Sequence, residues 1–473
     1  MKTSVKLKKK SFFPSKNMDL TTGPIFKTLV LFSIPIILTS LLNHLYSTID
    51  SLMLALMVSD KAVGAVGATH SIQLVITSLF SGLAVGASIV MGKYVGAKDK
   101  ENATRTVSTS ILLGVIGGAA VLLIALFFSR PLLVLTGTPK ALLEDSISYL
   151  IIVCMGCPIT LTTGFIGGIL RASGDTRSPF IHNSIGGLLN VLLNALFIAV
   201  FKMQVAGVAI ATVISQAFVL VLQVSKVVKE REIYHLTRKG FKLFKEQLVK
   251  IAIFGIPSGI NSMLTGFSHV VVQGAVNTFG EIGATASSIA NQIDYITVFS
   301  GGLISAATVF FSQNLGAKKI DRFKKVLKIT TLSCTVLTIG LSSLFILFSN
   351  NLLGIFTNDD KVIEFAKVKV LMLFSSYFVL EIHNVFASAV RVLGKPVTSM
   401  VVAMVCSVLF KVLWLLTVFN LLPTPYMLYA CYPISRVIYA ITIIPIYFKV
   451  LRKKQKQLNQ EKIVEDNKIE KVA

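Results

Sequence analysis

Long uninterrupted apolar runs restrict what this chain can fold into more than any other feature of its sequence. The run ILLGVIGGAAVLLIALFF at 111–128 contains no charged residue. It is apolar on every side of a helix, unlike the alternating segments of a membrane β-barrel. With 53% hydrophobic and 14% charged residues in 473 positions, the chain has room for about twelve spans of roughly 20 to 25 residues. We therefore predict an all-α integral membrane protein with about twelve transmembrane helices.

The predicted spans form two sets of six, separated by a short polar stretch. The first set comprises 25–57, 67–94, 105–128, 142–170, 177–201 and 206–228. The second set comprises 247–279, 284–315, 323–348, 362–390, 397–420 and 426–449. The chain thus divides into an N-terminal segment 1–24, an N-terminal lobe 25–228, a Lys-rich linker 229–246, a C-terminal lobe 247–449 and a tail 450–473.

The basic residues predict how these spans are oriented. The net charge is +24, and most lysines and arginines cluster beside alternate loops, among them 2–16, 93–105, 226–250 and 318–325. The positive-inside rule places such loops in the cytoplasm, so we expect both termini to be cytoplasmic in a bacterial inner membrane. Because the chain has no large polar domain to form a groove for nucleic acid, we assign the basic excess to topology.

Several function classes lack the motif that they need. All five cysteines lie in apolar segments, and Cys154 and Cys157 form the single CxxC, so we expect packing residues and no structural metal. The sequence contains no GxxxxGK[ST], HExxH or GxSxG motif, which argues against ATP-driven transport, zinc proteolysis and serine hydrolysis. We expect neither enzyme activity nor a cofactor.

The two sets of spans repeat a common pattern. FSIPIILTSL at 32–41 resembles FGIPSGINSM at 254–263, and GKYVGAKDKENATRTV at 92–107 resembles SQNLGAKKIDRFKKVL at 312–327. RASGDTRSP, which begins at Arg171, resembles RVLGKPVTS, which begins at Arg391; 391 minus 171 gives 220, as does 316 minus 96. An even number of spans in each half predicts two pseudo-symmetric six-helix bundles around a central cavity, as in transporters that work by alternating access.

At these residues the chain resembles the multidrug and toxic compound extrusion (MATE) transporters. The resemblance runs from about 18 to 449 and is carried by motifs in the family's order. They are MDLTTGPIFKTLVLFSIPIILTSLLNHLYSTIDSLM at 18–53, VGAKD at 95–99, ILRASGDTRSP at 169–179, LLNVLLNALFI at 188–198, VAGVAIATVISQ at 205–216 and FFSQNLGAKK at 310–319. The resemblance implies a secondary active efflux antiporter, a monomer in the lipid bilayer, that exports cationic or amphiphilic organic compounds in exchange for H⁺ or Na⁺.

Asp50 is the clearest candidate for coupling to an ion. A carboxylate inside the first predicted span costs at least about 2.5 kcal/mol, yet it binds a cation when ionised and becomes neutral when protonated. Asn190 and Asn194 share one face of the fifth span, and Thr212 lies on the sixth. The resemblance implies that these four residues line the ion site of the N-terminal lobe, with Na⁺ as one potential occupant. Many family members have Asp at the position of Asn194, and the alternative role for the amides is hydrogen bonding between helices.

The second set of spans carries its own intramembrane charges and a buried histidine. We predict that these residues line a substrate site or form a charge network, with Glu381 and Lys411 as an ion pair. They are Asp294, Glu381, His383, Lys411 and Arg436. Binding of a cationic substrate by Glu381 is the alternative. Arg171 and Arg391, at the ends of two spans, are expected to cap helix carbonyls.

Two alternatives to a multidrug exporter remain open from the sequence. A flippase for lipid-linked precursors, from the same superfamily, would present several basic residues in its cavity to attract diphosphate head groups. Lys411 and Arg436 favour it, whereas Asp50, Asp294 and Glu381 favour cations. A membrane-embedded transferase would instead release a chemically altered product.

Overall fold

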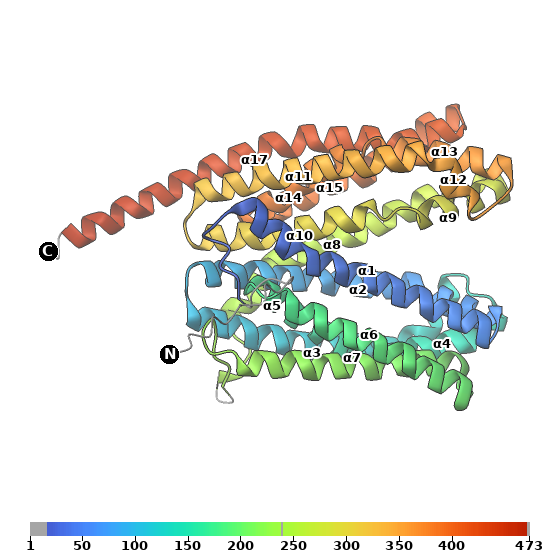
Figure 1. Cartoon of the computed structure of the whole chain (residues 1–473), viewed down its shortest axis with the longest axis horizontal. Coiled ribbons are helices and arrows are strands. Elements are labelled where there is room, and N and C mark those ends of the chain that lie inside the picture. Colours follow the sequence, from blue (N-terminus) through green and yellow to red (C-terminus); the bar gives the residue numbers. More distant parts are fainter. Residues whose placement is uncertain (1–16, 238–239, 471–473) are drawn as a thin grey trace, which may run out of the picture.

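The computed structural model describes residues 17–237 and 240–470, and in these residues it contains helices and connecting segments without a strand. The N-terminal half comprises α1 (Ile25–Met57), α2 (Asp60–Gly96), α3 (Lys100–Leu135), α4 (Lys140–Met155), α5 (Cys157–Ala172), α6 (Arg177–Ala195), the π-helical turn η1 (Leu196–Val200) and α7 (Gln204–Lys229). The C-terminal half comprises α8 (Lys245–Val276), η3 (Asn277–Phe279), α9 (Gly280–Gln292), α10 (Ile296–Gly316), α11 (Ile320–Leu347), α12 (Ser349–Gly354), α13 (Asp360–Phe374), α14 (Tyr377–Val392), α15 (Pro396–Ala403), η4 (Met404–Leu409), α16 (Phe410–Trp414), η5 (Leu415–Phe419) and α17 (Pro425–Glu470). Most of these helices run along one common direction (Figure 1), which confirms the predicted all-α fold.

The number of membrane crossings agrees with the prediction of about twelve. In the part of the chain that the structure describes, 10 helices are long and apolar enough to cross a membrane, or up to 12 if two bent helix pairs each form one span. The pairs are α4 with α5, bent by 49°, and α13 with α14, bent by 40°. The predicted spans 142–170 and 362–390 thus each correspond to one of these bent pairs.

Each bend has a local cause. Between α4 and α5 the chain passes Gly156, and Pro158 in the first turn of α5 has no backbone N–H to continue the helix ladder. Between α13 and α14 the guanidinium of Arg436 donates from Nη1 to the carbonyl of Leu373 at 2.6 Å. The same carbonyl accepts from the backbone N–H of Ser376 at 3.3 Å and from the Ser376 hydroxyl at 3.0 Å, so the arginine adds a charged donor to a carbonyl beside the bend.

The predicted span 284–315 is also divided. Helix α9 ends at Gln292, and α10 begins at Ile296, so Asp294 lies in the break rather than inside a helix. Its Oδ2 accepts a hydrogen bond from the hydroxyl of Tyr377. This corrects the placement of Asp294 within a continuous span.

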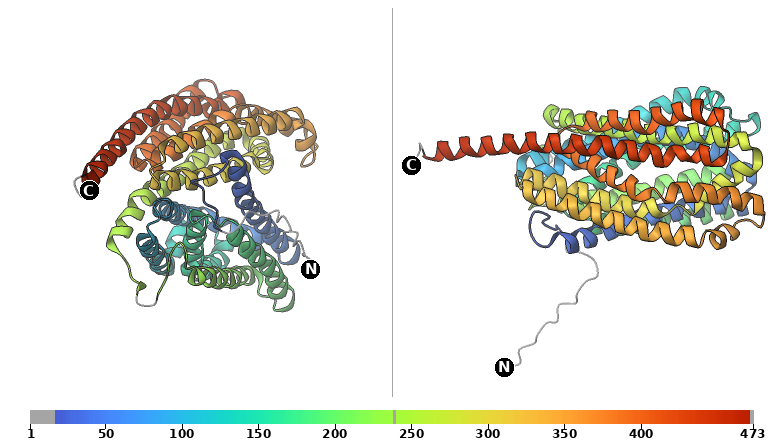
Figure 2. Two further views of the ribbon diagram at one scale, coloured as in Figure 1. Left: turned by 60° about the vertical axis from the view of Figure 1, so that its left-hand side comes forward. Right: turned by 90° about the horizontal axis from the view of Figure 1, so that it is seen from above.

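The helices form the two lobes that the repeat predicts. Figure 2 shows the N-terminal helices, blue to green, and the C-terminal helices, yellow to red, as two groups side by side. Helix α2 of the N-terminal lobe packs against α8 and α10 of the C-terminal lobe. A Cβ added to Gly82 would lie 2.0 Å from the backbone N of Gly259, so small residues allow this close approach.

The lobes also meet at the end that carries the loops 97–99 and 317–319, which we call the basic end. A Cβ at Gly96 would lie 1.9 Å from the carbonyl oxygen of Gln313, and a Cβ at Gly316 would lie 1.9 Å from that of Lys93. Gln313 also donates from Nε2 to the carbonyl of Ala172 at 2.8 Å, which joins the lobes directly. The lobes are therefore closed against each other at the basic end.

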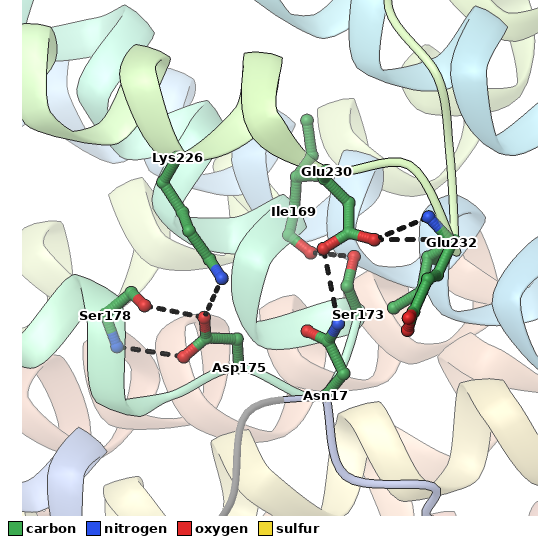
Figure 3. A network of polar contacts seen from close by, with 9 residues as sticks. Asn17, Ile169, Ser173, Asp175, Ser178, Lys226, Glu230 and Glu232 are labelled. Atoms are coloured by element: carbon green, nitrogen blue, oxygen red, sulfur yellow. Dashed lines mark hydrogen bonds and ion pairs between the residues drawn. The ribbon is translucent and has the colours of Figure 1, made fainter.

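The N-terminal strap, residues 17–24, lies across this closed end and contacts both lobes. On the C-terminal side, the backbone N of Leu20 donates to Gln313 Oε1 at 3.2 Å, and Arg322 donates from Nη1 to the carbonyl of Gly23 at 2.9 Å. On the N-terminal side, Asn17 donates from Nδ2 to Glu230 Oε2 at 3.2 Å (Figure 3). The strap thus connects the end of α7 to the start of α11.

Glu230 and Asp175 organise the polar network around the strap (Figure 3). Asp175, 1% exposed, accepts hydrogen bonds from the backbone and the hydroxyl of Ser178 and forms an ion pair with Lys226 at 3.3 Å. Burial alone would raise the pKa of Glu230, but hydrogen bonds from the backbone of Glu232 and Ile233 hold that pKa below its ordinary value. The ionised form of Glu230 is therefore favoured in this network.

Candidate functional site

The four residues assigned to the N-terminal ion site form one continuous chain of contacts. Asn194 donates from Nδ2 to Asp50 Oδ1 at 2.6 Å, and the same nitrogen lies 3.4 Å from Asn190 Oδ1. Asn190 donates from Nδ2 to Thr212 Oγ1 at 3.3 Å. The contacts link α1, α6 and α7, so a change at Asp50 reaches three helices of the lobe.

Local structure explains why these side chains converge. Asn190 and Asn194 are one helical turn apart in α6 and are buried, and the π-helical turn η1 begins two residues after Asn194. Thr212 donates its hydroxyl proton to the carbonyl of Val208 at 3.0 Å, so its lone pairs remain to accept from Asn190. The spacing of the two asparagines in α6 and the hydrogen bond from the Thr212 hydroxyl to its own helix thus determine the order of these contacts.

The N-terminal site is rich in oxygen acceptors. Asn194 Oδ1 is buried without a hydrogen-bond partner, and Asp50 forms no ion pair among the described residues. Carboxylate and amide oxygens are hard ligands suited to a small cation, and a carboxylate also accepts a proton. The described residues contain no group of three or more His, Cys, Asp or Glu side chains that would hold a metal ion.

The C-terminal lobe contains a separate cavity of about 490 Å³, which we call the C-terminal cavity. The four charged residues and the histidine that the sequence singled out all contribute to its wall, because α10, α14, η4, α16 and α17 converge there. The predicted members that line it are Asp294, Glu381, His383, Lys411 and Arg436. The imidazole of His383 stacks on the ring of Tyr439, with centroids 4.2 Å apart and an interplanar angle of 18°.

The predicted ion pair between Glu381 and Lys411 is wrong. Glu381 Oε1 accepts a hydrogen bond from the hydroxyl of Ser300 at 2.8 Å, whereas Lys411 donates to Ser268 Oγ at 3.1 Å. In the described chain, no nitrogen of Lys411 comes within 4.0 Å of a carboxylate oxygen. The two residues line the same cavity, but their side chains bond to different helices. The prediction failed because residue spacing does not fix the rotation of one helix relative to another.

A third cation of the C-terminal cavity was not predicted. Lys369 in α13 donates to the carbonyl of Ser287 at 3.0 Å, to Ser287 Oγ at 2.8 Å and to Asn291 Oδ1 at 2.7 Å. The sequence contained a signal for this residue, because Lys369 lies between Val368 and Val370 in a predicted membrane span.

A second cavity of about 570 Å³, the central cavity, lies between the lobes and is lined by residues of both. Arg171 and Arg391 both line it, and its described lining includes no acidic side chain. Arg391 and Ile304 also line the C-terminal cavity, so the two cavities adjoin. The expectation that these arginines merely cap helix ends missed their place on the cavity walls.

Comparison with known proteins agrees with this architecture. A protein-family model described as MatE matches residues 35–196 and 257–415, which is more than half of the chain. The chain is 25% identical over 378 residues to the probable multidrug resistance protein YoeA of Bacillus subtilis, covering 78% of this chain and 82% of that protein. It is 22% identical over 374 residues to the multidrug export protein MepA of Staphylococcus aureus, covering 79% and 83%.

The fold likeness is closer than the sequence identity suggests. A crystal structure described as MATE in the bent conformation matches with a TM-score of 0.88 at 20% identity, covering 94% of this chain and 99% of that one. The resemblance inferred from the motifs is thereby confirmed. With a family model that spans both repeats and a twelve-helix, two-lobe fold, the chain belongs to the MatE family of membrane transporters, which are not enzymes.

Proposed function

We propose that the chain is a secondary active multidrug exporter, which moves cationic or amphiphilic organic compounds out of the cell in exchange for H⁺ or Na⁺. The names of the relatives YoeA and MepA, a multidrug resistance protein and a multidrug export protein, support efflux of drug-like compounds. The central cavity between two pseudo-symmetric lobes supports alternating access.

The observation that carries the proposal is the chain of contacts from Asp50 to Thr212. Ion or proton occupancy of Asp50 changes the charge that Asn194 meets, and so changes how firmly α1 is tied to α6 and α7. A ligand that binds one arrangement more tightly shifts the population towards it. The coupling ion thereby biases the lobe that faces the substrate cavity.

The orientation follows from the charges. The closed basic end is the cytoplasmic one in this proposal, because its loops carry most of the lysines and arginines. The transporter then lies in the bacterial inner membrane as a monomer with both termini in the cytoplasm. Opening of the basic end would admit substrate, and its closure would release the substrate outwards.

Transport in proteoliposomes tests the proposal. Export of a fluorescent organic cation is measured under a Na⁺ gradient and, separately, under an H⁺ gradient, for the wild type, Asp50→Asn and Asp145→Asn. Asp145 lies on the exposed surface of α4 and serves as the matched control. We expect Asp50→Asn to reduce gradient-driven export to the level of empty vesicles and Asp145→Asn to transport normally.

The effective gradient identifies the ion. If neither gradient drove export of any organic compound by folded wild-type protein, the exporter proposal would fail. If Asp50→Asn exported normally, coupling would have to lie elsewhere.

A flippase for lipid-linked precursors is the second candidate, and one observation favours it: basic residues line both cavities. The relatives named above are drug-resistance proteins, which favours the exporter. The two candidates differ in whether the head group arrives on a lipid, and the following section tests that difference.

A further inference from the structure

The C-terminal cavity has the opposite charge from what a binding site for simple organic cations requires. Its described lining contains four basic side chains and two acidic ones, so its formal charge is positive. The basic residues are Lys369, Arg391, Lys411 and Arg436, and the acidic residues are Asp294 and Glu381. A cation entering this cavity would meet more repulsion than attraction.

Three of these cations are more than nine-tenths buried and form no ion pair. Lys369, Lys411 and Arg436 are 6%, 9% and 7% exposed. In the residues that the structure describes, none lies within 4.0 Å of a carboxylate oxygen. Their partners are serine hydroxyls, an amide and backbone carbonyls, which solvate a charge without neutralising it. Burying cations in this way is costly unless an anion compensates them.

Two of the cations still have hydrogen atoms to donate. The ammonium of Lys411 has three N–H groups, and among the residues that the structure describes it makes one hydrogen bond, to Ser268 Oγ. Among the described residues, Arg436 donates from Nη1 to the carbonyl of Leu373 and to Ser376 Oγ. The N–H groups of Nε and Nη2, on the other side of the planar guanidinium, remain to bind a ligand. An arginine fork of this kind matches the two oxygens of a carboxylate or phosphate.

These two donors face the same aromatic wall. Lys411 Nζ lies 4.2 Å from the ring centroid of Tyr432, and the guanidinium carbon of Arg436 lies 5.7 Å from the same centroid. Tyr377, 4.6 Å from that guanidinium carbon, continues the wall. A cavity of about 490 Å³ with tyrosine rings beside two cations holds an organic body and an anionic group together.

Arg391 connects this cavity to the transport path. It lines both the central and the C-terminal cavity, and its Nε is buried without a hydrogen-bond partner. An anion that enters the central cavity between Arg171 and Arg391 therefore passes a residue with a positive charge that lines both cavities on the way to Lys411 and Arg436.

We propose that the C-terminal cavity binds the carboxylate or phosphate of an amphiphilic substrate through Lys411 and Arg436, so that the transported compounds include amphiphilic anions and zwitterions. This inference rests on the proposed exporter function and names the substrate class of its C-terminal lobe. Lys369, whose three N–H groups are all bound, contributes charge from the wall rather than direct contact.

Binding to the purified full chain in an uncharged detergent tests the inference without any gradient. The probe is 1-pyrenebutyrate, and its counterpart has the same ring and chain with a trimethylammonium group. Trp414 is the single tryptophan of the chain and lies in α16 with Lys411, so energy transfer from Trp414 to pyrene reports binding near the cavity. We expect the carboxylate to bind more tightly than the trimethylammonium compound.

Variants of Lys411 then locate the charge that matters. Lys411→Gln should weaken pyrenebutyrate binding about tenfold, and Lys411→Arg should restore most of it, because one charge-assisted hydrogen bond is lost and regained. Lys361→Gln, an exposed lysine at the start of α13, is the matched control and should bind normally. The thermal unfolding midpoint of each variant establishes that it is folded.

Two results would overturn the inference. One is a trimethylammonium compound that binds as tightly as the carboxylate, and the other is folded Lys411→Gln protein with unchanged affinity for pyrenebutyrate. Because no gradient is used, loss of ion-driven export with binding retained would count against the exporter proposal alone.

Competition identifies the source of the anion. Displacement of pyrenebutyrate by phosphatidic acid, but not by phosphatidylcholine, would assign the cavity to a lipid phosphate. Displacement by soluble aromatic carboxylates but not by phosphatidic acid would assign it to compounds that are not lipids. Either result supports an anion-binding cavity.

Discussion

The two lobes descend from one repeated pattern, yet their polar interiors differ in kind. The N-terminal site contains one carboxylate, two amides and a hydroxyl, joined in series from Asp50 to Thr212. The C-terminal cavity contains buried cations that lie beside tyrosine rings and form no ion pair among the described residues. In our proposals, the N-terminal site binds a small cation and the C-terminal cavity binds an anionic group.

The features that the repeats retain lie between the lobes. Gly96 and Gly316 occupy equivalent positions and meet the facing helix at the same distance, and Arg171 and Arg391 both line the central cavity. Repetition thus preserves helix contacts, which depend on shape, while polar residues inside each lobe are free to differ. A transporter built this way can assign ion coupling to one lobe and substrate selection to the other.

The largest expected effect comes from Asn194→Leu, which removes the donor to Asp50. Loss of a buried hydrogen bond to a carboxylate costs about 3 kcal/mol, equivalent to a roughly hundredfold change in an equilibrium constant. We expect ion-driven export in proteoliposomes to fall by about that factor, while pyrenebutyrate binding in detergent remains. Asn183→Leu is the control, because Asn183 lies on the same helix and donates from Nδ2 to the carbonyl of Pro179. Equal loss of export and of anion binding would show that the two lobes are not separate in function.

The sequence predicted the fold better than the interior. Apolar length and the repeat were sufficient for twelve spans in two lobes, because a lipid-embedded helix must be long and apolar. The break around Asp294 was not predicted, because hydropathy averaged over a window does not show where a helix is interrupted. Proline and glycine mark possible bends, but only the packing of neighbouring helices decides which one forms.

The same limit applies to side chains. Asn190 and Asn194 could be placed on one face from their spacing, but that they share a site with Asp50 was expected from the family resemblance alone. Glu381 and Lys411 were predicted to pair because of their opposite charges. In the structure Glu381 accepts a hydrogen bond from a serine hydroxyl, and Lys411 donates to a different serine. Periodicity fixes neighbours within a helix and leaves the rotation of one helix against another undetermined.

The contact between the lobes at Gly96 and Gly316, which we call the seam, is tested by alanine at either glycine. The two substitutions show whether the equivalent positions contribute equally. Gly96→Ala and Gly316→Ala each place a Cβ 1.9 Å from a backbone oxygen, and overpacking of this kind costs about 1–3 kcal/mol. We expect both variants to lower the thermal unfolding midpoint by similar amounts. Gly340→Ala, where nothing lies within 4 Å, should leave the midpoint unchanged or raise it. A loss confined to one of the two seam positions would contradict the symmetrical seam.

Arg391→Gln and Arg171→Gln compare two arginines that are equivalent in the repeat but line different cavities. Arg391 lines both cavities, whereas Arg171 lines the central cavity alone. We expect Arg391→Gln to slow the association of pyrenebutyrate about fivefold and Arg171→Gln to slow it less, because a charge near the path raises the rate of encounter. Stopped-flow energy transfer from Trp414 measures both rates, with Arg452→Gln on exposed α17 as the control. Equal slowing by the two variants would argue that the C-terminal cavity is not where the probe settles.

The smallest expected effect concerns the strap, which is tied to the N-terminal lobe through Glu230 and to the C-terminal lobe through Arg322. The pKa of Glu230 lies below its ordinary value of 4.5, so its ionised form stabilises the folded state above that pH, and this contribution is lost as the pH falls through the folded pKa. Glu230→Gln should lower stability by about 1 kcal/mol at neutral pH and by less in acid, where the wild type has lost part of the same contribution. Thermal unfolding at about pH 7 and about pH 4 measures the difference, with the exposed Glu232→Gln as control. A Glu230→Gln protein that is as stable as the wild type at neutral pH would mean that the strap is held by its C-terminal anchor alone.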